Sequence, residues 1–206
     1  VPMRLRTEKQ IRSELNENNY AISIEHPVLT SAIGAIPKKD GGIRLIHDLS
    51  LPVKGSLNSH ASKDPCAYQT VSDALQCIQP GWFMAKVDLQ AAYRSVAIRP
   101  AEYPLTGLKW NFNNDIQATY MFDRKLPFGA RKSPAIFNRI TQAVQRMMQN
   151  RGYACVVLLD DFFVAAASFQ ECVHVYNERI HLLRSLGFRI NWNKVIDPTQ
   201  DLVFLG

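Results

Sequence analysis

Two adjacent aspartates interrupt an apolar region, where their side chains could bind divalent cations. Asp160 and Asp161 follow the run Val156–Leu159 and precede the run Phe162–Val164. Neighbouring carboxylates between apolar segments repel each other and contribute little stability unless a cation balances their charge. Carboxylate oxygens of this kind bind Mg²⁺ or Mn²⁺. A simple polar turn is the alternative for an Asp-Asp pair, and the apolar flanks favour the metal site.

Asp88 is a third aspartate of the same kind, because it ends the apolar run Trp82–Val87. Taken alone, Asp88 would more simply cap the turn at residues 89–93. Together with the Asp160–Asp161 pair, it could hold two cations about 3.5–4 Å apart, the arrangement used for in-line phosphoryl transfer. One cation would activate a primer hydroxyl, and the other would neutralise a triphosphate and its leaving pyrophosphate.

The composition is compatible with a polyanionic partner. The 206 residues carry 24 Lys and Arg against 18 Asp and Glu, a net charge of +6. Many proteins have this charge without binding nucleic acid, so the excess is only supportive. The four cysteines form no CxxC pair, which favours a reducing, intracellular compartment, cytoplasmic or nuclear. No apolar run reaches the length of a membrane span, so no membrane partner is expected.

The aspartates must be positioned by hairpins. Asp160–Asp161 is predicted to be the turn between the strands Tyr153–Leu159 and Phe162–Ala167. Asp40-Gly41 is a strong turn signal for a second hairpin. The other predicted strands are Ala32–Pro37 and Gly42–His47, Leu105–Phe112 and Ile116–Phe122, Trp82–Asp88, Arg189–Trp192 and Leu202–Leu205.

Four helices are predicted from capping signals and apolar spacing. They span about 7–18, 72–78, 133–150 and 168–187, the second capped by Ser72. Thr7 with Gln10, and Ser168 with Glu171, fit capping boxes, and Ser133 is a typical N-cap because Pro134 follows it. Residues 51–68 are rich in Ser, Pro, Gly and Asn and are predicted to be a loop. Hairpins covered by helices indicate an α+β fold.

Six segments, taken together, resemble the motifs of reverse transcriptases. They occur in that family's order over nearly the whole chain, which makes the match specific. Ile36–Arg44 is similar to the fingers hairpin, and Val87–Tyr93 and Leu126–Phe137 are similar to the first and second catalytic motifs. Leu158–Asp161 is similar to the metal-binding hairpin, and Gly187–Lys194 is similar to the motif that follows it. Phe204–Gly206 is similar to the start of the primer grip. Leu-Pro-Phe-Gly at 126–129 and Leu-Asp-Asp-Phe at 159–162 look most like retrotransposons of the tyrosine-recombinase group.

The resemblance implies a fingers–palm fragment of a right-hand polymerase, with an antiparallel palm sheet packed on helices. The fingers would comprise about 1–80 and 105–135, and the palm about 81–104 and 136–206. Thumb and ribonuclease H domains are absent from these residues. They are expected in the remainder of a polyprotein, with a recombinase or integrase as a further option.

The activity implied is RNA-directed DNA polymerisation, which adds deoxynucleotides from their triphosphates to a primer on an RNA or DNA template. Two Mg²⁺ or Mn²⁺ ions would be the cofactors. By resemblance, Asp88 and Asp160 bridge both ions, Asp161 assists, and the Leu89 carbonyl completes the nucleotide-side ion. Lys194 matches a lysine near the leaving pyrophosphate and is a candidate proton donor, with an exposed surface lysine as the alternative.

Further roles concern the nucleotide. Lys38 and Arg44 match fingers residues that hold the triphosphate, for which cations and a guanidinium are suited. A solvated basic hairpin is the alternative. The backbone of Gln90 and Ala91 would also face the phosphates. In the family, an aromatic ring at the position of Tyr93 packs under the sugar and excludes a 2′-hydroxyl, whereas a core tyrosine is the alternative.

Gly129 would let the backbone approach the incoming base and the template closely. Phe128, also expected to contact substrate, stands where retroviral enzymes have Gln. Two other departures are Leu158, where many members have Tyr, and Ser50, where an arginine is common. These changes affect nucleotide affinity and fidelity and leave the metal chemistry intact.

Three rival functions remain. An RNA-dependent RNA polymerase would typically place Asp at the position of Tyr93. A catalytically inactive nucleic-acid-binding scaffold would not need to retain Asp88, Asp160 and Asp161. A metal-dependent nuclease fits the carboxylates alone, but no arrangement for a nucleophilic water is identifiable.

Overall fold

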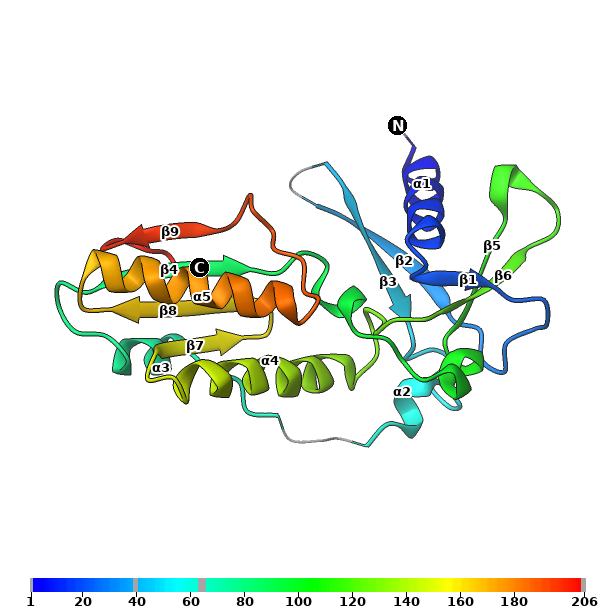
Figure 1. The fold of residues 1–206 in the computed structure, drawn as a ribbon. Helices are drawn as coiled ribbons and strands as arrows, with labels where there is room; N and C mark the ends of the chain where they lie inside the picture. The colour runs from blue at the N-terminus through cyan, green and yellow to red at the C-terminus, as the bar shows by residue number, and fades with distance from the viewer. Residues whose placement is uncertain (1, 39–40, 63–65, 205–206) are drawn as a thin grey trace. The chain divides into compact units, whose positions relative to one another are not determined.

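The computed structural model describes residues 2–38, 41–62 and 66–204 (Figure 1). They form two compact units, and each unit is built from two separate stretches of the chain. The first unit comprises Val1–Asp64 and Val96–Ser133, and the second comprises Pro65–Ser95 and Pro134–Gly206. Both units contain antiparallel strands and helices, which confirms the α+β fold class. Within the described ranges, no helix is long and apolar enough to cross a lipid bilayer.

The first unit contains a three-stranded antiparallel sheet, a separate hairpin and several short helices. The sheet has the order β1-β6-β5, and the hairpin pairs β2 with β3. The elements are α1 (Met3–Asn16), β1 (Tyr20–Ile22), β2 (Ala32–Pro37), β3 (Ile43–Asp48), α2 (Leu57–His60), the 3-10 helices η2 (Pro100–Leu105) and η3 (Phe112–Asn114), β5 (Gly107–Trp110) and β6 (Thr119–Asp123).

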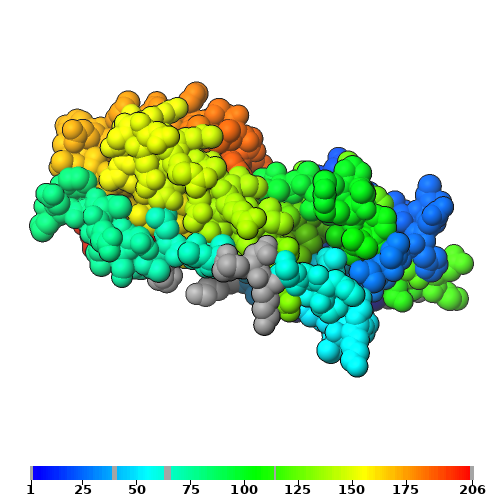
Figure 2. Space-filling view, turned by 90° about the horizontal axis from the view of Figure 1, so that it is seen from below, coloured from blue at the N-terminus to red at the C-terminus, as the bar shows by residue number. Residues whose placement is uncertain are grey.

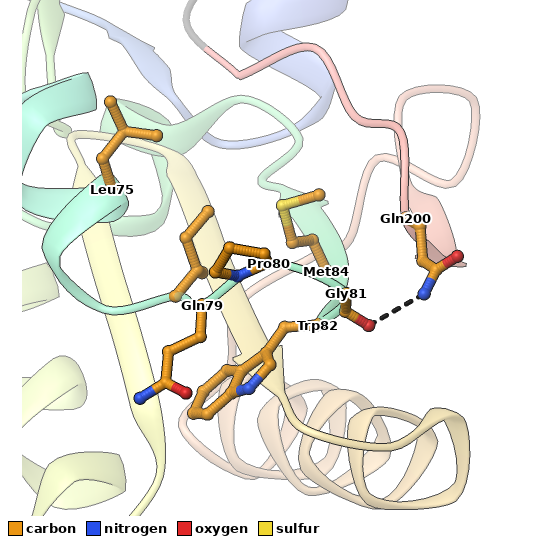
Figure 3. A pocket seen from close by; sticks show the side chains of 8 residues that line it. Leu75, Gln79, Pro80, Gly81, Trp82, Met84 and Gln200 are labelled. Carbon is orange, nitrogen blue, oxygen red and sulfur yellow. Dashed lines mark hydrogen bonds between the residues drawn. The ribbon is translucent and has the colours of Figure 1, made fainter.

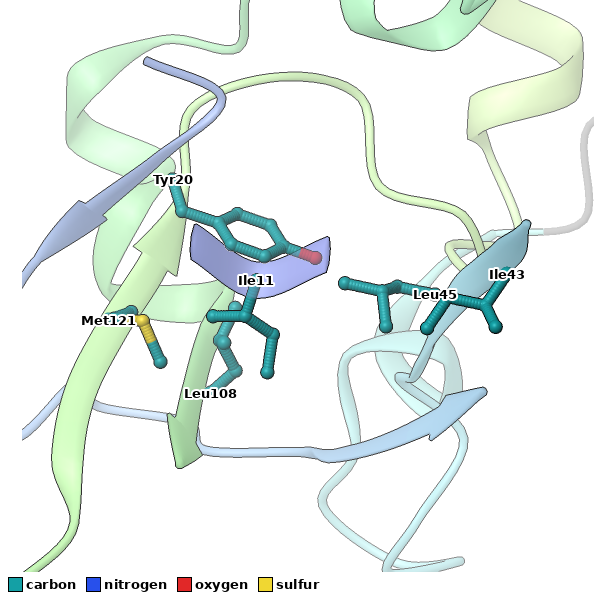
Figure 4. Close-up of a cluster of buried hydrophobic side chains, with 6 residues drawn as sticks. All are labelled: Ile11, Tyr20, Ile43, Leu45, Leu108 and Met121. Carbon is teal, nitrogen blue, oxygen red and sulfur yellow. The ribbon is translucent and has the colours of Figure 1, made fainter. Parts of the chain in front are cut away.

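The core of the first unit joins the helix, the sheet and the hairpin. Figure 4 shows its buried side chains, which come from α1, β1, β3, β5 and β6. They are Ile11, Tyr20, Ile43, Leu45, Leu108 and Met121. Burial of this apolar surface stabilises the two hairpins against each other and against α1.

The first helix begins earlier than the sequence predicted. The expected capping box at Thr7 is wrong, because the Thr7 hydroxyl donates to the Met3 carbonyl inside the helix, 2.9 Å away. Residues 51–68 also contain α2, which the prediction of a loop missed. The hydroxyl of Ser56 caps α2 by accepting from the Ser59 N–H.

The second unit is a four-stranded antiparallel sheet with the order β7-β8-β4-β9. Its elements are α3 (Val71–Gln76), β4 (Phe83–Asp88), the 3-10 helix η1 (Ala92–Ser95), α4 (Ser133–Gln149), β7 (Ala154–Leu158), β8 (Asp161–Ala166), α5 (Phe169–Ser185) and β9 (Ile196–Thr199). Helix α5 packs on β8, β4 and β9. Its buried Arg179 lies over the ring of Phe162, with the guanidinium carbon 4.9 Å from the ring centroid.

Helix α3 and residues 202–204 cover the opposite face of this sheet. Val156 and Phe163 point to that face and pack with Ala74 of α3, and Leu202 and Phe204 lie against the same cluster. Figure 2 shows the α3 segment beside the segment that leads into β7. Strand alternation places Phe162 on one face and Phe163 on the other, so both faces of β8 are buried.

Two predicted helix starts in this unit are corrected. Helix α3 is capped by Thr70 in a capping box with Asp73, and not by Ser72. Ser133 is the first residue of α4 and not its N-cap, because its hydroxyl donates to the Pro127 carbonyl, 2.9 Å away. The predicted capping box of Ser168 and Glu171 at the start of α5 is confirmed.

The strands predicted after α5 are also corrected. Residues 189–192 form no strand, and only Ile190 makes an isolated bridge, to Leu89. The edge strand beside β4 is β9, which pairs with β4 through Ile196 opposite Lys86. Residues 202–204 form no strand, and Leu205 lies outside the described residues.

The boundaries between the two units differ from the predicted boundaries between fingers and palm. Residues 65–80 belong to the second unit, because the Gln69 side chain accepts the Val157 N–H at 2.9 Å and α3 packs on β7. Residues 96–104 belong to the first unit, because the Val96 carbonyl accepts the Leu126 N–H at 3.0 Å.

Candidate active site

Strands β4 and β8 bring two of the three aspartates directly opposite each other. Asp88 is the last residue of β4, Asp161 is the first residue of β8, and they are cross-strand partners. Asp160 immediately precedes β8, and its carbonyl accepts the Leu89 N–H at 3.2 Å. The three carboxylates therefore emerge from adjacent backbone positions at one end of the sheet, as the sequence predicted.

The hairpin turn lies one residue earlier than the sequence predicted. Leu158 pairs with Asp161, so the two turn residues are Leu159 and Asp160. Leu159 has a φ of 53°, and a positive φ at the first turn position is typical of a type II′ turn, which favours glycine there. A leucine in this conformation is strained by about 1–3 kcal/mol, and such strain is concentrated at functional sites.

Asp88 is almost fully buried and is held by two polar partners. Its side chain accepts from Asn191 Nδ2 at 2.9 Å, and Lys194 Nζ lies 3.3 Å from the second oxygen. The Asn191 N–H also donates to the Asp88 carbonyl at 2.9 Å. Burial raises the pKa of Asp88 above its ordinary value, and Lys194 and Asn191 oppose this rise. Nearby Asp161 raises the pKa of Asp88 further.

The other two carboxylates have different surroundings. Burial raises the pKa of Asp160, and the charges of Asp161 and Asp88 add to the rise. Asp161 forms an ion pair with Lys86, whose Nζ is 3.0 Å from Asp161 Oδ1. The pairing of Asp88 with Asp161, and the position of Asp160 next to Asp161, bring three like charges close enough to repel one another.

The chemistry of this donor set fits Mg²⁺ or Mn²⁺. Carboxylate oxygens are the ligands these hard cations prefer, and a divalent cation relieves the repulsion that raises the aspartate pKa values. The aspartates are not drawn together onto one point, since no three acidic, His or Cys side chains in the described ranges converge as a metal-ligand cluster. The fit therefore rests on the chemistry of the donors and their shared edge of the sheet.

Tyr93 lies in the same unit, near the carboxylates. It belongs to η1, and its ring packs edge-to-face on buried Phe137, with centroids 5.5 Å apart. Burial raises the pKa of Tyr93 to about 12, and the charge of Asp160 contributes to this rise. The structure thus brings the predicted sugar-contacting ring near Asp160 in the turn between β7 and β8.

The turn after Asp88 has an irregular backbone. Ala91 is exposed and has a φ of 50°, and its carbonyl accepts the Arg94 N–H at 2.8 Å. The Gln90 N–H donates to the Arg189 carbonyl at 2.8 Å, so in this conformation it is directed at the protein and not at a phosphate.

The remaining predicted site residues belong to the first unit. Arg44 of β3 lies over the ring of Phe128, with the guanidinium carbon 5.7 Å from the ring centroid. The Phe128 carbonyl accepts the His47 N–H at 2.7 Å. Lys38 is exposed at the end of β2, and its N–H donates to the Gly42 carbonyl at 2.9 Å. Lys39 and Asp40, the centre of the predicted turn, lie outside the described residues.

Gly129 is fixed by close packing against β3. Its φ is +116°, and a Cβ atom at this position would lie 1.9 Å from the His47 carbonyl oxygen. Asn58 holds the same loop, because its Nδ2 donates to the Gly129 carbonyl at 2.8 Å and its Oδ1 accepts the Arg131 N–H at 2.7 Å. The glycine is therefore required by backbone packing within the unit.

The polar side chains of Lys86, Asn191 and Asn58 bind predicted site residues and were given no role from the sequence. Strand alternation places Lys86 on the same face as Asp88, and this signal was available. Asn191 lies within the quoted segment Gly187–Lys194 without an assigned role. Asn58 lies in α2, which was predicted to be a loop, so no local signal connected it to Gly129.

A cavity lies at the other end of β4 from Asp88. It has a volume of about 490 Å³ and is lined by α3, Trp82, Met84 and Gln200 (Figure 3). Gln200 Nε2 donates to the Gly81 carbonyl at 2.8 Å. Its lining carries no aspartate, glutamate, lysine or arginine side chain, in contrast to the carboxylate end of the same strand.

Comparison with known families tests the resemblance that the sequence motifs indicated. Residues 36–206 match the family model described as reverse transcriptase (RNA-dependent DNA polymerase). The chain belongs to the reverse transcriptase family. The matched residues contain Asp88, Asp160, Asp161, Lys194 and Tyr93, so all the site residues of the second unit lie within the reverse transcriptase domain.

Relatives of this reverse transcriptase chain are polyproteins of transposons and viruses. The chain is 24% identical over its whole length to the retrovirus-related Pol polyprotein from transposon opus of Drosophila melanogaster, of which it covers 20%. Over 59% of its length it is 24% identical to the genome polyprotein of Petunia vein clearing virus, of which it covers 5%. The chain thus spans a small part of these relatives.

Solved reverse transcriptases share the fold. A foamy viral protease–reverse transcriptase in complex with double-stranded DNA superposes with a TM-score of 0.82 at 17% identity, covering all of this chain and 40% of that one. The same viral protein in complex with an RNA/DNA hybrid gives a TM-score of 0.80, with all of this chain and 26% of that one covered. This likeness confirms the expected fingers–palm fold.

Proposed function

We propose that this chain is the catalytic part of an RNA-directed DNA polymerase, which adds deoxynucleotides to a primer end. The observation that carries the proposal is the cross-strand pairing of Asp88 with Asp161, with Asp160 in the adjoining turn. Such a group of carboxylates at one end of a sheet fits two-metal phosphoryl transfer. Membership in the reverse transcriptase family supplies the reaction class.

Asp88 and Asp160 would hold two Mg²⁺ or Mn²⁺ ions, assisted by Asp161 and the Leu89 carbonyl. When bound, such ions activate the primer hydroxyl and neutralise charge on the triphosphate. The protein itself fixes the carboxylates on paired strands and buries Asp88 and much of Asp160. Burial excludes water, which strengthens the attraction between the carboxylates and cationic groups.

Lys194 would deliver a proton to the leaving pyrophosphate. Its side chain is 63% exposed and forms an ion pair with Asp88 at 3.3 Å. The exposed side chain can exchange this contact for a phosphate oxygen when cations neutralise Asp88. A lysine ammonium carries the proton that a leaving pyrophosphate oxygen needs.

The substrates in this proposal are deoxynucleoside triphosphates and a primer–template. Lys38 and Arg44 would bind the triphosphate, together with backbone groups of Gln90 and Ala91, while Phe128 and Gly129 would contact the base and the template. Two structures of the foamy viral protease–reverse transcriptase, which share this fold, contain double-stranded DNA and an RNA/DNA hybrid. The net charge of +6 is compatible with such polyanionic partners.

Tyr93 favours a DNA polymerase over an RNA polymerase. Its ring is packed on Phe137 and lies near Asp160, so it presents a rigid surface beside the reaction centre. A bulky ring there would clash with a 2′-hydroxyl and accept a 2′-deoxyribose.

Three finer assignments also belong to the proposal. The segments Leu126–Gly129 and Leu159–Phe162 support an origin in a retrotransposon of the tyrosine-recombinase group. The polyprotein relatives support a longer parent protein that adds a thumb, a ribonuclease H domain and a recombinase or integrase. The four cysteines are free thiols, which supports an intracellular location, cytoplasmic or nuclear.

A primer-extension assay tests the proposal. The protein is given a matched primer on RNA and on DNA templates, with primer–template in excess, Mg²⁺, and either deoxynucleoside or ribonucleoside triphosphates. Extension on RNA with deoxynucleotides is expected. Extension with ribonucleotides alone would identify an RNA polymerase, and primer–template binding without any extension would identify an inactive scaffold.

A further inference from the structure

Lys86 lies beside the carboxylates and has no role in the mechanism described above. It precedes Asp88 by two residues, so both side chains project from the same face of β4. Its direct cross-strand partner is Phe163, which makes Asp161 its diagonal neighbour on β8. Lys86 Nζ lies 3.0 Å from Asp161 Oδ1, a buried oxygen for which this ion pair is the polar contact among the described residues.

The two lysines near the site differ in their freedom to move. The side chain of Lys86 is 15% exposed and that of Lys194 is 63% exposed. Lys86 is flanked on its face by Met84 and opposed by Phe163, both part of an apolar cluster. An apolar neighbourhood holds the aliphatic stem of a lysine and directs its ammonium to the nearest polar group, here Asp161.

We propose that Lys86 is a positioning residue of the metal site, which holds one carboxylate oxygen of Asp161 and leaves the other oxygen for a cation. This inference rests on the proposed function. It explains in physical terms why Asp161 would be the assisting ligand and Asp88 and Asp160 the principal ones. Asp161 shares its charge with a fixed ammonium, whereas the cationic partner of Asp88 is an exposed lysine that can leave, and its other partner, Asn191, is neutral.

The sign of the effect follows from the charges. A fixed ammonium at 3.0 Å from Asp161 competes with a divalent cation for the same carboxylate and repels that cation. Lys86→Met keeps an unbranched apolar stem and removes the charge, so it is expected to bind Mn²⁺ roughly fivefold more tightly. Lys86→Arg keeps the charge and is expected to remain within about twofold of the wild-type affinity.

A Mn²⁺ titration, with free Mn²⁺ followed by electron paramagnetic resonance, measures this directly without nucleic acid. Lys9→Met is the matched control, because Lys9 is exposed on α1 of the first unit and its loss changes the net charge equally. Of these two variants, only Lys86→Met is expected to bind Mn²⁺ more tightly than the wild type. In the absence of Asp161 the gain should vanish, so the double variant Lys86→Met/Asp161→Asn should have the same Mn²⁺ affinity as Asp161→Asn. Equal affinities of Lys86→Met and Lys9→Met, or a full gain without Asp161, would overturn the inference.

A second measurement separates positioning from a merely structural role. In primer extension, Lys86→Met should lower the half-saturating Mg²⁺ concentration about fivefold and also lower the maximal rate, because Asp161 loses its fixed orientation. Lys86→Arg should restore both values, and Lys86→Gln provides a second neutral variant if Met disturbs folding. An unchanged half-saturating Mg²⁺ concentration in both neutral variants would contradict the role.

The same titration tests the proposed metal site separately. Wild-type Mn²⁺ affinity in an Asp88→Asn/Asp160→Asn variant would show that these aspartates do not bind the metal, and would reject the proposed site. Loss of Mn²⁺ binding in that variant, with no effect at Lys86, would reject only the positioning role.

Discussion

At the scale of single residues, the proposed role of Asp160 conflicts with the stability of the fold, because a metal ligand must be ionised. Burial and the charges of Asp161 and Asp88 raise its pKa. A folded state with a raised aspartate pKa binds a proton more tightly than the unfolded state does. The resulting stabilisation is present at low pH and is lost as the pH rises through the folded pKa, so ionised Asp160 destabilises the fold at neutral pH.

Asp160→Asn should therefore raise the free energy of unfolding at pH 7 in the presence of a chelator. The gain should shrink as the pH falls toward 3.8, the ordinary aspartate pKa, because wild-type Asp160 is then also neutral. Urea unfolding at several pH values measures this, with exposed Asp201→Asn as the control. Added Mg²⁺ should stabilise the wild type more than the variant. A variant less stable than wild type at pH 7 would contradict this account.

Tyr93 carries the prediction on sugar selection. Tyr93→Ala removes the ring that packs on Phe137, so ribonucleotide incorporation relative to deoxynucleotide should rise by about tenfold or more. Tyr93→Phe keeps the ring and should discriminate as the wild type does. Single-nucleotide kinetics with both sugars provide the ratio, and an unchanged ratio in Tyr93→Ala would reject the steric role.

At the scale of elements, the close packing of the Gly129 loop against β3 is expected to contribute to the stability of the first unit. Gly129→Ala would place a methyl group against the His47 carbonyl and would also require a strained φ of +116°. Gly55→Ala is the matched control, because Gly55 has a φ of +95° and a methyl group added there would meet nothing within 4 Å. Gly129→Ala should lower the free energy of unfolding by about 2 kcal/mol more than Gly55→Ala. Equal losses of unfolding free energy in the two variants, measured by urea unfolding, would show that the loop can move to accommodate the methyl group.

Most elements could be predicted from local patterns, and the failures have physical causes. The hairpins β2–β3 and β7–β8 follow from apolar runs around turn signals, and α5 follows from its capping box. Strand β9 contains Pro198 and has no strong β pattern, so only its pairing with β4 defines it. Long-range pairing of this kind leaves no local signal in the sequence.

The candidate site was predictable to a similar extent. The apolar flanks of Asp88 and Asp160 were sufficient to place carboxylates at strand ends. The contacts of Asn58 with Gly129 and of Asn191 with Asp88 could not be predicted, because they join residues that are 71 and 103 positions apart in the sequence. Polar contacts over such separations depend on the tertiary fold.

At the scale of the whole molecule, each unit has its own buried cluster and its own share of the predicted site. The carboxylates, Lys194 and Tyr93 belong to the second unit, and Arg44, Phe128 and Gly129 belong to the first. The carboxylates that would support nucleotide transfer therefore lie in the second unit alone.

Single-nucleotide incorporation by Asp88→Asn, at saturating primer–template and Mg²⁺, tests this role of the carboxylates most directly. Asp201→Asn removes an exposed carboxylate of the second unit and is the matched control. Loss of a principal metal ligand costs several kcal/mol of transition-state stabilisation, so the rate should fall by about a thousandfold or more while thermal unfolding shows a folded protein. A rate for Asp88→Asn within about threefold of the rate for Asp201→Asn would contradict the two-metal assignment.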